Sequence, residues 1–334
     1  MAADGLHSGM PSASRVVHAD SRGRAFDVIC AGEALVGLAA DGAAVTEPSL
    51  GFRPGGGAVG AALSLARQGL RVGLATVLSD DALGRGLKKR IAGAGVDAGA
   101  GVDAGGVELA HPSSGIMFVR GGARQVVAVH DAERPVAIPE GWTSQVLLLS
   151  GMSPVVSHGA ALCKAARAGR RAGAVVVVDV NARWELWKGR DARSILMILR
   201  EADVVWSSAA DLFGLNMDAV AMRAAMREDA VLASSDGAGS AIVTGPFGEV
   251  VRTPSDRDRN GGRGAPVTTA GALDALGALG ALDALDERDA FATAICAELA
   301  WAGHAGERSG ELWTRALARG HEAVTALAAR ISGR

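Results

Sequence analysis

Short apolar runs alternate with longer stretches of helical periodicity over most of the chain. Each apolar run is four to six residues long and rich in Val, Leu and Ala, as is typical of strands buried in a parallel sheet. The predicted strands are 26–31, 72–77, 146–149, 174–179, 203–206, 240–244 and 249–252. The predicted helices are 58–69, 81–93, 157–171, 191–200, 218–228, 271–284, 287–302 and 311–330. This alternation predicts an α/β fold with a doubly wound, mostly parallel sheet.

Two segments interrupt the alternation. Residues 38–54 are irregular and contain two prolines, while residues 107–130 alternate apolar and polar side chains around Gly121 and Gly122. Alternation on both sides of a glycine pair is typical of a β-hairpin rather than of a strand–helix–strand unit. We therefore expect these two segments to form an inserted β element that projects from the main sheet as a small lid.

Charge and hydropathy exclude two classes of partner. The 334-residue chain has a formal net charge of −2 and a sequence pI of 6.4. It lacks the basic excess of nucleic-acid-binding domains. No apolar run approaches the length of a membrane span, and the Ala/Leu-rich stretch around residues 271–285 is interrupted by Asp274 and Asp283. We expect no nucleic-acid partner and no membrane partner.

Cysteine usage and the N-terminal segment bear on compartment and domain boundaries. The three cysteines lie far apart, and the sequence contains no Cys-x-x-Cys and no Cys/His cluster. This pattern argues against a disulfide framework and against a structural zinc site. Residues 1–25 are polar and small without the apolar core of a signal peptide, so we expect a disordered tail. The prediction is a cytoplasmic protein with one large domain over residues 26–330.

A glycine cluster precedes the first predicted helix. Gly55, Gly57 and Gly60 match the Gly-x-Gly-x-x-Gly fingerprint of dinucleotide-binding proteins, and Asp80 lies at the spacing of its acidic residue. The fingerprint must follow a strand directly, whereas a loop of about twenty residues precedes this cluster. We expect these glycines to let the backbone approach a substrate. An NAD-dependent dehydrogenase is the more distant alternative.

A turn rich in Thr and Gly opens the predicted helix 271–284, and Asp274 lies in its first turn. Free N–H groups and the helix dipole make such a turn an anion site. A carboxylate at this place can accept the proton of an attacking hydroxyl during phosphoryl transfer. The simpler alternative is that Asp274 only stabilises the helix N-terminus.

Polar residues follow the predicted strand 174–179 directly. They are Asp179, Asn181 and Arg183. In open parallel sheets, ligands bind beyond the carboxyl ends of the strands, so these side chains predict substrate contacts. A turn closed by an Asx hydrogen bond is the alternative.

Taken together, four segments resemble the ribokinase-like (PfkB) carbohydrate kinase family. The segment FDVICAGEAL at 26–35 resembles the opening strand of the family with its Gly-Glu pair. Residues 55–69 and 72–84 resemble the first signature, and 179–183 with Trp187 resembles the D-x-N-x-R…LW segment. Residues 268–274 resemble the second signature, whose usual core is Gly-Ala-Gly-Asp. The order and spacing of these segments make the resemblance specific over about residues 26–330.

The resemblance implies a three-layer α/β/α sandwich with a β lid, and a reaction between ATP with Mg²⁺ and a small sugar-like or nucleoside-like acceptor. It implies that Asp274 is the catalytic base and that the anion hole is formed by Gly271, Ala272 and Leu273. The implied substrate-binding residues are Gly56, Gly57, Gly60, Asn181 and Arg183. The implied nucleotide-binding residues are Ser208, Thr244, Gly245 and Gly248, with Asp211 as a weaker metal-binding candidate. The resemblance also implies a homodimer formed through the lid.

Several family positions hold other residues in this chain. Leu273 replaces the second glycine of the anion hole, and Gly37 and Gly60 replace residues that normally contact sugar hydroxyls. Ser208 and Asp211 replace the two ends of the Asn-x-x-Glu motif that organises Mg²⁺. Two hypotheses follow: a kinase with an unusual acceptor, and a catalytically impaired protein of the same fold that binds or senses a small molecule.

Overall fold

The computed structural model describes residues 26–41, 49–93, 102–110, 115–120, 123–128, 136–150, 159–182, 193–235, 240–252, 287–302 and 310–332. These residues form a main sheet of nine strands and a second sheet of four. The main sheet contains β1 (Phe26–Gly32), β4 (Val72–Ser79), β5 (Val102–Ala110), β8 (Ser144–Ser150), β9 (Val175–Asp179), β10 (Val204–Ser208), β11 (Val231–Ser235), β12 (Ala241–Gly245) and β13 (Gly248–Arg252). The helices are α1 (Gly57–Arg67), α2 (Ala82–Ala92), α4 (Gly159–Arg171), α6 (Arg193–Leu199), α7 (Ala209–Gly214), α8 (Ala219–Ala225), α11 (Glu287–Ala302) and α12 (Gly310–Ser332).

The main sheet is wound outward in two directions from β1, the third strand from one edge. Its strand order is β13-β12-β11-β10-β9-β8-β1-β4-β5, and every pair from β11 to β5 is parallel. The chain first runs from β1 to β4 and β5, and then returns to β8 on the other side of β1. The order therefore reverses between β1 and β8, which is where doubly wound sheets bind ligands.

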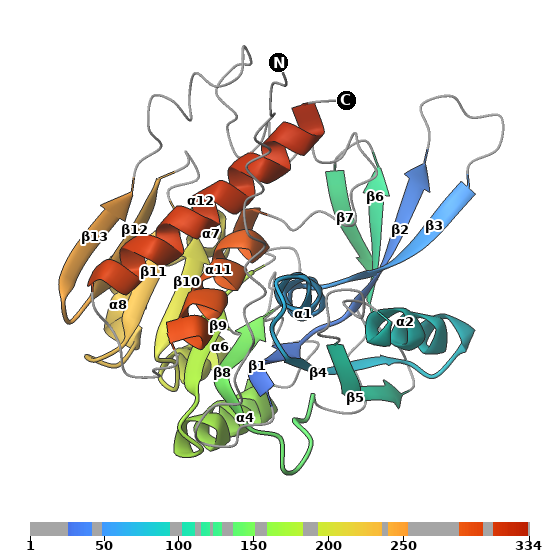
Figure 1. Cartoon of the computed structure of the whole chain (residues 1–334), viewed down its shortest axis with the longest axis horizontal. Coiled ribbons are helices and arrows are strands. Elements are labelled where there is room, and N and C mark those ends of the chain that lie inside the picture. Colours follow the sequence, from blue (N-terminus) through green and yellow to red (C-terminus); the bar gives the residue numbers. More distant parts are fainter. Residues whose placement is uncertain are drawn as a thin grey trace, which may run out of the picture.

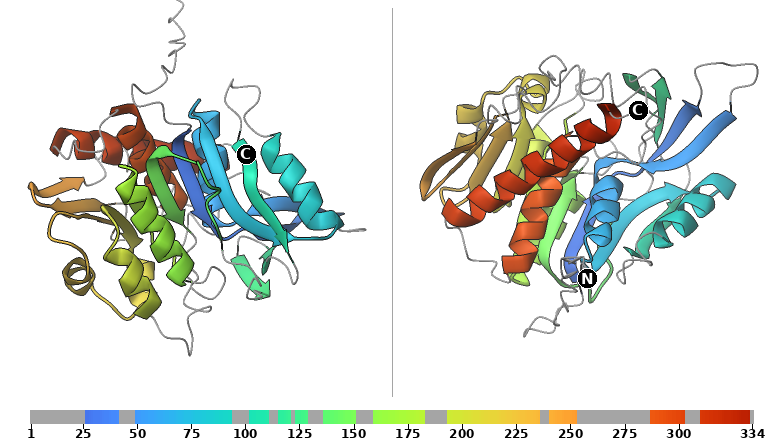
Figure 2. Two further views of the ribbon diagram at one scale, coloured as in Figure 1. Left: turned by 90° about the horizontal axis from the view of Figure 1, so that it is seen from below. Right: turned by 45° about the horizontal axis from the view of Figure 1, so that its top comes forward.

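Helices cover both faces of the main sheet, as the two views of Figure 2 show. On one face, alternate residues of the strands pack with α1, α2, α11 and α12 in a cluster that includes Cys30, Leu148 and Trp206. On the other face, Leu147 and Val178 belong to a second cluster with α4, α6 and α8. Because strands with apolar residues on both faces need cover on both, the sequence pattern and the three layers agree. The α/β/α sandwich predicted above is confirmed.

The second sheet contains β2 (Leu35–Asp41), β3 (Ser49–Gly55), β6 (Gly115–Arg120) and β7 (Ala123–Ala128) in the order β3-β2-β6-β7. Figure 1 shows it projecting from one end of the main sheet above α2. Residues 49–55, 115–120 and 123–128 thus belong to the expected β element, and the described part of the segment 38–54 is strand rather than irregular. Residues 107–110 do not belong to it, because they form the last part of β5 in the main sheet.

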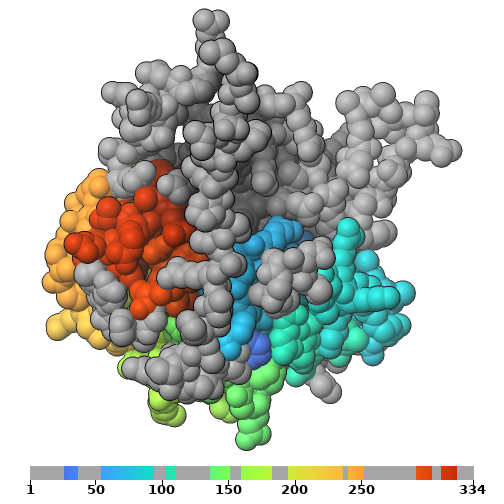
Figure 3. Space-filling model, viewed as in Figure 1, coloured from blue at the N-terminus to red at the C-terminus, as the bar shows by residue number. Residues whose placement is uncertain are grey.

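The pair α11 and α12 covers the half of the sheet that β8 to β13 form. Phe291 of α11 stacks on Trp206 of β10 with ring centroids 4.7 Å apart. The buried Glu298 of α11 forms ion pairs with Arg315 and Arg319 of α12, which fix the two helices together. In Figure 3, this red layer lies beside the orange β12–β13 hairpin. None of the described helices has the length and apolar character needed to cross a membrane.

Candidate active site

Polar residues end five of the parallel strands at one edge of the main sheet, which we call the carboxyl edge. Each of them ends a strand made mostly of buried apolar residues, and each is itself buried: Ser79 of β4, Ser150 of β8, Asp179 of β9, Ser208 of β10 and Ser235 of β11. Glu33, also buried, follows β1 directly. Polar side chains are rarely buried unless they are bonded or used, so this edge is the candidate active site.

The centre of the edge is the close approach of β1 and β8. Gly32 pairs with Ser150, and a Cβ added to Gly32 would lie 1.8 Å from the Ser150 carbonyl oxygen. The carbonyl of Gly32 also accepts a 2.7 Å hydrogen bond from the hydroxyl of Thr76 on β4. Only glycine lets the ends of β1 and β8 meet this tightly, at the point where the strand order reverses.

The end of β9 is held by its neighbours on both sides. The Ser150 hydroxyl donates a 2.6 Å hydrogen bond to Oδ2 of Asp179, and the Val180 N–H donates to the Trp206 carbonyl at 3.0 Å. Asn181 follows with a φ of 37° and is buried. Asn tolerates this left-handed region better than most residues. The structure thus brings Asp179 and Asn181 to the carboxyl edge, as the sequence predicted.

The glycines before α1 lie against the end of β1. Gly56 is the N-cap of α1 at a φ of 99°, and a Cβ there would lie 2.5 Å from the carbonyl oxygen of Glu33. Gly57 begins the helix and is buried, while the N–H of Gly60 donates to the Gly56 carbonyl at 2.9 Å. Because the N-cap has no side chain, the first-turn N–H groups of α1 receive no side-chain cap. Gly56 therefore lies at the carboxyl edge, and Gly57 and Gly60 belong to the first turn of the helix that starts there.

Asp211, the metal-binding candidate, is engaged in a helix cap. Its Oδ2 accepts hydrogen bonds from the Ser208 backbone N–H at 2.7 Å and from the Ser208 hydroxyl at 2.6 Å, forming a capping box at the start of α7. The Asp211 side chain is fully buried. Mg²⁺ requires oxygen ligands that are open to the ion and its waters, so this arrangement does not fit it. Within the described ranges, no group of three His, Cys, Asp or Glu could hold a metal.

The hairpin of β12 and β13 carries Thr244, Gly245 and Gly248, for which we expected nucleotide contacts. β12 is antiparallel to β11, and Thr244 pairs with Leu232 near the beginning of β11. Since β11 is parallel to β10, the hairpin turn lies at the opposite edge of the sheet. The structure therefore does not bring these three residues to the ends of β9 and β10. The place that they were expected to occupy is held by Ser235 at the end of β11.

The remaining predicted residues lie outside the described residues: Arg183, Gly271, Ala272, Leu273 and Asp274. Conversely, the sequence analysis did not select Ser150 or Ser235. The signal that identifies both is a serine that ends a run of buried apolar residues, in the segments VLLLS and VLASS. This signal is weak by itself and becomes specific only when several strands share it.

Two buried thiols, those of Cys30 and Cys296, lie in the apolar core between β1 and α11. Burial raises the pKa of Cys30 on β1 and of Cys296 on α11 far above the usual thiol value. The negative charge of Asp179 adds to the shift of the Cys296 pKa. Both thiols therefore stay protonated, and they act as small apolar groups rather than as nucleophiles.

Comparisons with known proteins agree with this geometry. The model of the pfkB family carbohydrate kinases matches residues 25–257. None of the curated proteins matches the sequence. Aminoimidazole riboside kinase from Salmonella enterica, complexed with aminoimidazole riboside and an ATP analog, is 22% identical at a TM-score of 0.66 over 89% of this chain and 92% of that chain. Fructokinase from Xylella fastidiosa with bound ATP is 20% identical at 0.64 over 91% and 94%. Fructokinase from Vibrio cholerae O395 in apo form is 18% identical at 0.66 over 92% and 98%.

Proposed function

Because the chain belongs to the pfkB family of carbohydrate kinases, we propose that it transfers the γ-phosphoryl group of ATP to a hydroxyl of a small sugar-like or nucleoside-like molecule. The observation that carries this proposal is the row of buried polar residues at the carboxyl edge of a doubly wound sheet. Such edges bind ligands. Solved structures of the same fold that hold ATP, or an ATP analog with a riboside, support ATP as the phosphoryl donor.

In this proposal the acceptor binds between the end of β9 and the start of α1. Asn181 offers both a donor and an acceptor to a hydroxyl group, and Arg183 follows two residues later. Gly56, Gly57 and Gly60 line the other side and leave room for a bulky acceptor, since they present backbone rather than side chains. The adenine nucleotide then lies over the ends of β10 and β11, near Ser208 and Ser235.

The chemical step is assigned to residues 271–274. The acceptor hydroxyl gives its proton to the Asp274 carboxylate while its oxygen attacks the γ-phosphorus, and ADP leaves with the electrons of the broken P–O bond. The backbone N–H groups of Gly271, Ala272 and Leu273 stabilise the charge on the transferred phosphoryl group. No step of this proposal depends on a metal held by Asp211, because its carboxylate caps α7.

A second candidate function is binding of a small molecule without turnover. The observation that favours it is the capping role of Asp211, together with Leu273 in place of glycine at the anion hole. Leu brings a side chain toward the phosphate and resists a positive φ. The two candidates share one site and differ only in whether the phosphoryl group moves.

A coupled assay of ADP formation, with a panel of sugars and nucleosides as acceptors, tests the proposal. We expect turnover of a nucleoside-like or weakly hydroxylated acceptor, and poor turnover of ribose and fructose, because Gly37 and Gly60 lack side chains that bond sugar hydroxyls. Calorimetric titration of each acceptor separates binding from catalysis. Acceptor binding without ADP formation favours the second candidate, whereas efficient turnover of ribose contradicts the predicted specificity.

A further inference from the structure

A hollow of about 300 Å³ lies at the amino edge of the main sheet, opposite the candidate active site. It is lined by Arg167, Arg170, Arg171 and Glu201. The arginines belong to the last two turns of α4, which returns the chain from the carboxyl end of β8 to the start of β9. The five residues of β9 span about 13 Å at the usual rise of a strand, so the hollow and Asp179 lie at opposite ends of that strand.

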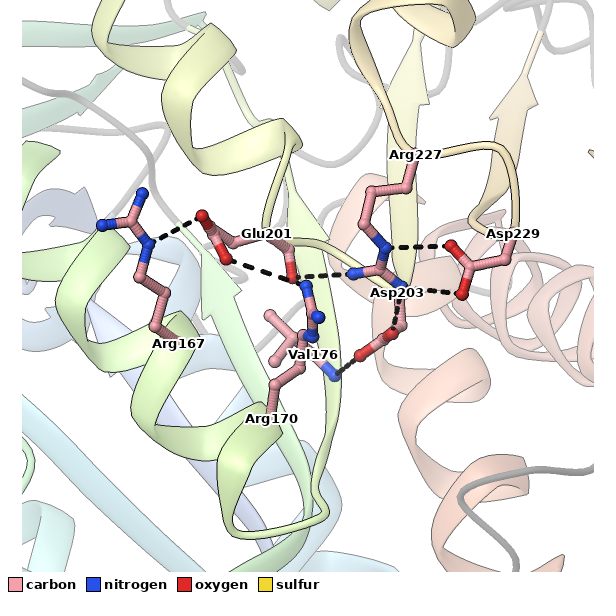
Figure 4. Close-up of polar contacts among 7 residues, drawn as sticks. All are labelled: Arg167, Arg170, Val176, Glu201, Asp203, Arg227 and Asp229. Atoms are coloured by element: carbon pink, nitrogen blue, oxygen red, sulfur yellow. Dashed lines mark hydrogen bonds and ion pairs between the residues drawn. The ribbon is translucent and has the colours of Figure 1, made fainter.

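The three arginines face the same side of α4, since they are three and four residues apart. Figure 4 shows Arg167 and Arg170 directed toward Glu201. Arg167 Nε pairs with Glu201 Oε1 at 2.7 Å, and the Arg170 guanidinium lies 3.7 Å from Oε2. Among the described residues, Arg171 has no ion-pair partner. One carboxylate, itself mostly covered, thus orients two guanidinium groups that remain accessible to solvent.

Two further carboxylates of the described residues, those of Asp203 and Asp229, are already paired with Arg227. Its guanidinium binds Asp203 at 2.7 Å and Asp229 at 2.9 Å, and Asp203 also accepts the Val176 N–H at 2.9 Å (Figure 4). They are therefore not available to the arginines of α4. Glu201 balances one of the three guanidinium charges, and the carboxyl end of α4 contributes about half a negative charge. The hollow keeps an excess of more than one positive charge.

We propose that this hollow binds a phosphate group, as inorganic phosphate or as a small phosphate monoester, at a site separate from the candidate active site. The planar guanidinium binds phosphate oxygens in pairs and is weakly hydrated, so converging arginines favour phosphate over a halide or a single carboxylate. A volume of about 300 Å³ accommodates a phosphate with a small organic group, at the lower end of the range of ligand sites. This inference does not rest on the proposed phosphoryl transfer.

Titration calorimetry at constant ionic strength tests the proposal, with inorganic phosphate and glycerol phosphate as probes. A non-hydrolysable ATP analog is kept in excess so that phosphate cannot bind at the carboxyl edge. Arg171→Gln removes one guanidinium without breaking an ion pair to any residue that the structure describes. Lys89→Gln is the matched control, because Lys89 is also an exposed basic residue in the last turn of a helix, α2.

We expect one saturable phosphate site, which Arg171→Gln weakens by about tenfold, the value of one charge-assisted hydrogen bond. Arg170→Gln should weaken it in the same direction, and Lys89→Gln should leave it unchanged. Tighter binding of glycerol phosphate supports a monoester as the ligand, and equal binding supports free phosphate. The proposal is overturned if the wild type shows no saturable binding, or if Arg171→Gln and Lys89→Gln have equal effects. Binding of long polyanions without binding of phosphate also overturns it.

Discussion

The Ser150 hydroxyl donates a hydrogen bond of 2.6 Å to the buried carboxylate of Asp179, joining the ends of two neighbouring strands beside the point where the strand order reverses. The sequence analysis selected Asp179 as a candidate site residue but did not select Ser150. Since both groups are buried, neither can exchange its partner for bulk water.

Ser150→Ala should destabilise the protein by about 1.5–3 kcal/mol, because the Asp179 carboxylate loses a hydrogen bond in a buried site. Ser144→Ala is the control, as Ser144 is a buried serine at the other end of the same strand. Urea denaturation gives both free energies of unfolding. A cycle with Asp179→Asn measures the coupling between the two side chains. If both serine variants lose the same free energy of unfolding, the hydrogen bond between Ser150 and Asp179 does not add to the stability.

Gly32→Ala should be among the most damaging single substitutions in the sheet, costing roughly 3 kcal/mol or more. The added Cβ would lie 1.8 Å from a backbone oxygen of β8, which cannot move without separating the strands. Gly86→Ala provides a control of opposite sign. Gly86 lies within α2 with open space around it, so alanine there should stabilise the protein by about 0.5–1 kcal/mol. Thermal unfolding of the two variants reports both signs, and a neutral Gly32→Ala contradicts the geometry.

Asp274→Asn should reduce turnover by roughly 10²–10⁴-fold, as expected for a lost general base, while ATP binding is retained. The matched control is Asp283→Asn. Residues 271–276 recur as 280–285, so Asp283 has the same local sequence but lies nine residues further along the predicted helix. Nine residues at 3.6 per turn place it on the opposite face and about 13 Å away. Steady-state kinetics and ATP titration decide, and unchanged turnover in Asp274→Asn rejects the assigned role.

Asp81 makes a small contribution to stability that depends on pH. Its carboxylate caps α2 by accepting the Gly84 N–H at 2.8 Å, and this bond lowers the pKa of Asp81 below its ordinary value of 3.8. A lowered folded-state pKa means that the stabilisation is present at neutral pH and is lost as the pH falls through that value. Asp81→Asn keeps a cap but does not titrate. The difference in unfolding free energy between wild type and Asp81→Asn should therefore shrink as the pH falls from 6 to 3. A difference that grows in acid would contradict this sign.

ATP, and not NAD or NADP, should raise the melting temperature in a dose-dependent manner, since a ligand that binds only the folded state stabilises it by mass action. The glycines at 55–60 match a dinucleotide fingerprint in letters alone. In the structure β3 leads directly into them, where the sequence suggested a loop, and they lead into α1 beside Glu33. However, β3 is antiparallel to β2 in the second sheet, while the next strand, β4, belongs to the main sheet, so the glycines are not part of the strand–helix–strand unit of one parallel sheet that the fingerprint needs. A shift with NAD and none with ATP would reverse the assignment.

The sequence predicted the main strands because their apolar runs are continuous and long enough. β1, β8 and β9 are buried on both faces, and nothing but a parallel sheet between helices suits such runs. β5 was assigned in part to the lid because it is an edge strand. Its residues 107–109 read Val-Glu-Leu, an alternation of apolar and polar side chains with the same period as a hairpin. Periodicity alone does not reveal which sheet an alternating strand joins.

One missed strand explains the error in the predicted site. VLASS at 231–235 is short and ends in two serines, so β11 was not predicted. Without it, β12 counts as the next parallel strand, and Thr244 would end at the carboxyl edge. With β11 present, β12 returns in the opposite direction, and its end lies at the other edge. The direction of a strand depends on which strand it pairs with. A local sequence pattern does not contain that information. By contrast, Asp179 and Asn181 were placed well because they follow a strand that the sequence made unmistakable.

Because α11 and α12 cover one half of the sheet, the apolar face of that half stays exposed during synthesis until these two helices have been made. Trp206 and the inner residues of β8, β9 and β10 are synthesised well before Phe291, which packs on them. On a ribosome that adds ~5–20 residues per second, this apolar face stays uncovered for seconds. Nascent chains of this protein thus expose a large apolar surface, which can aggregate, before α11 and α12 are synthesised. Its yield in cells should depend on chaperones more than the stability of the finished fold suggests.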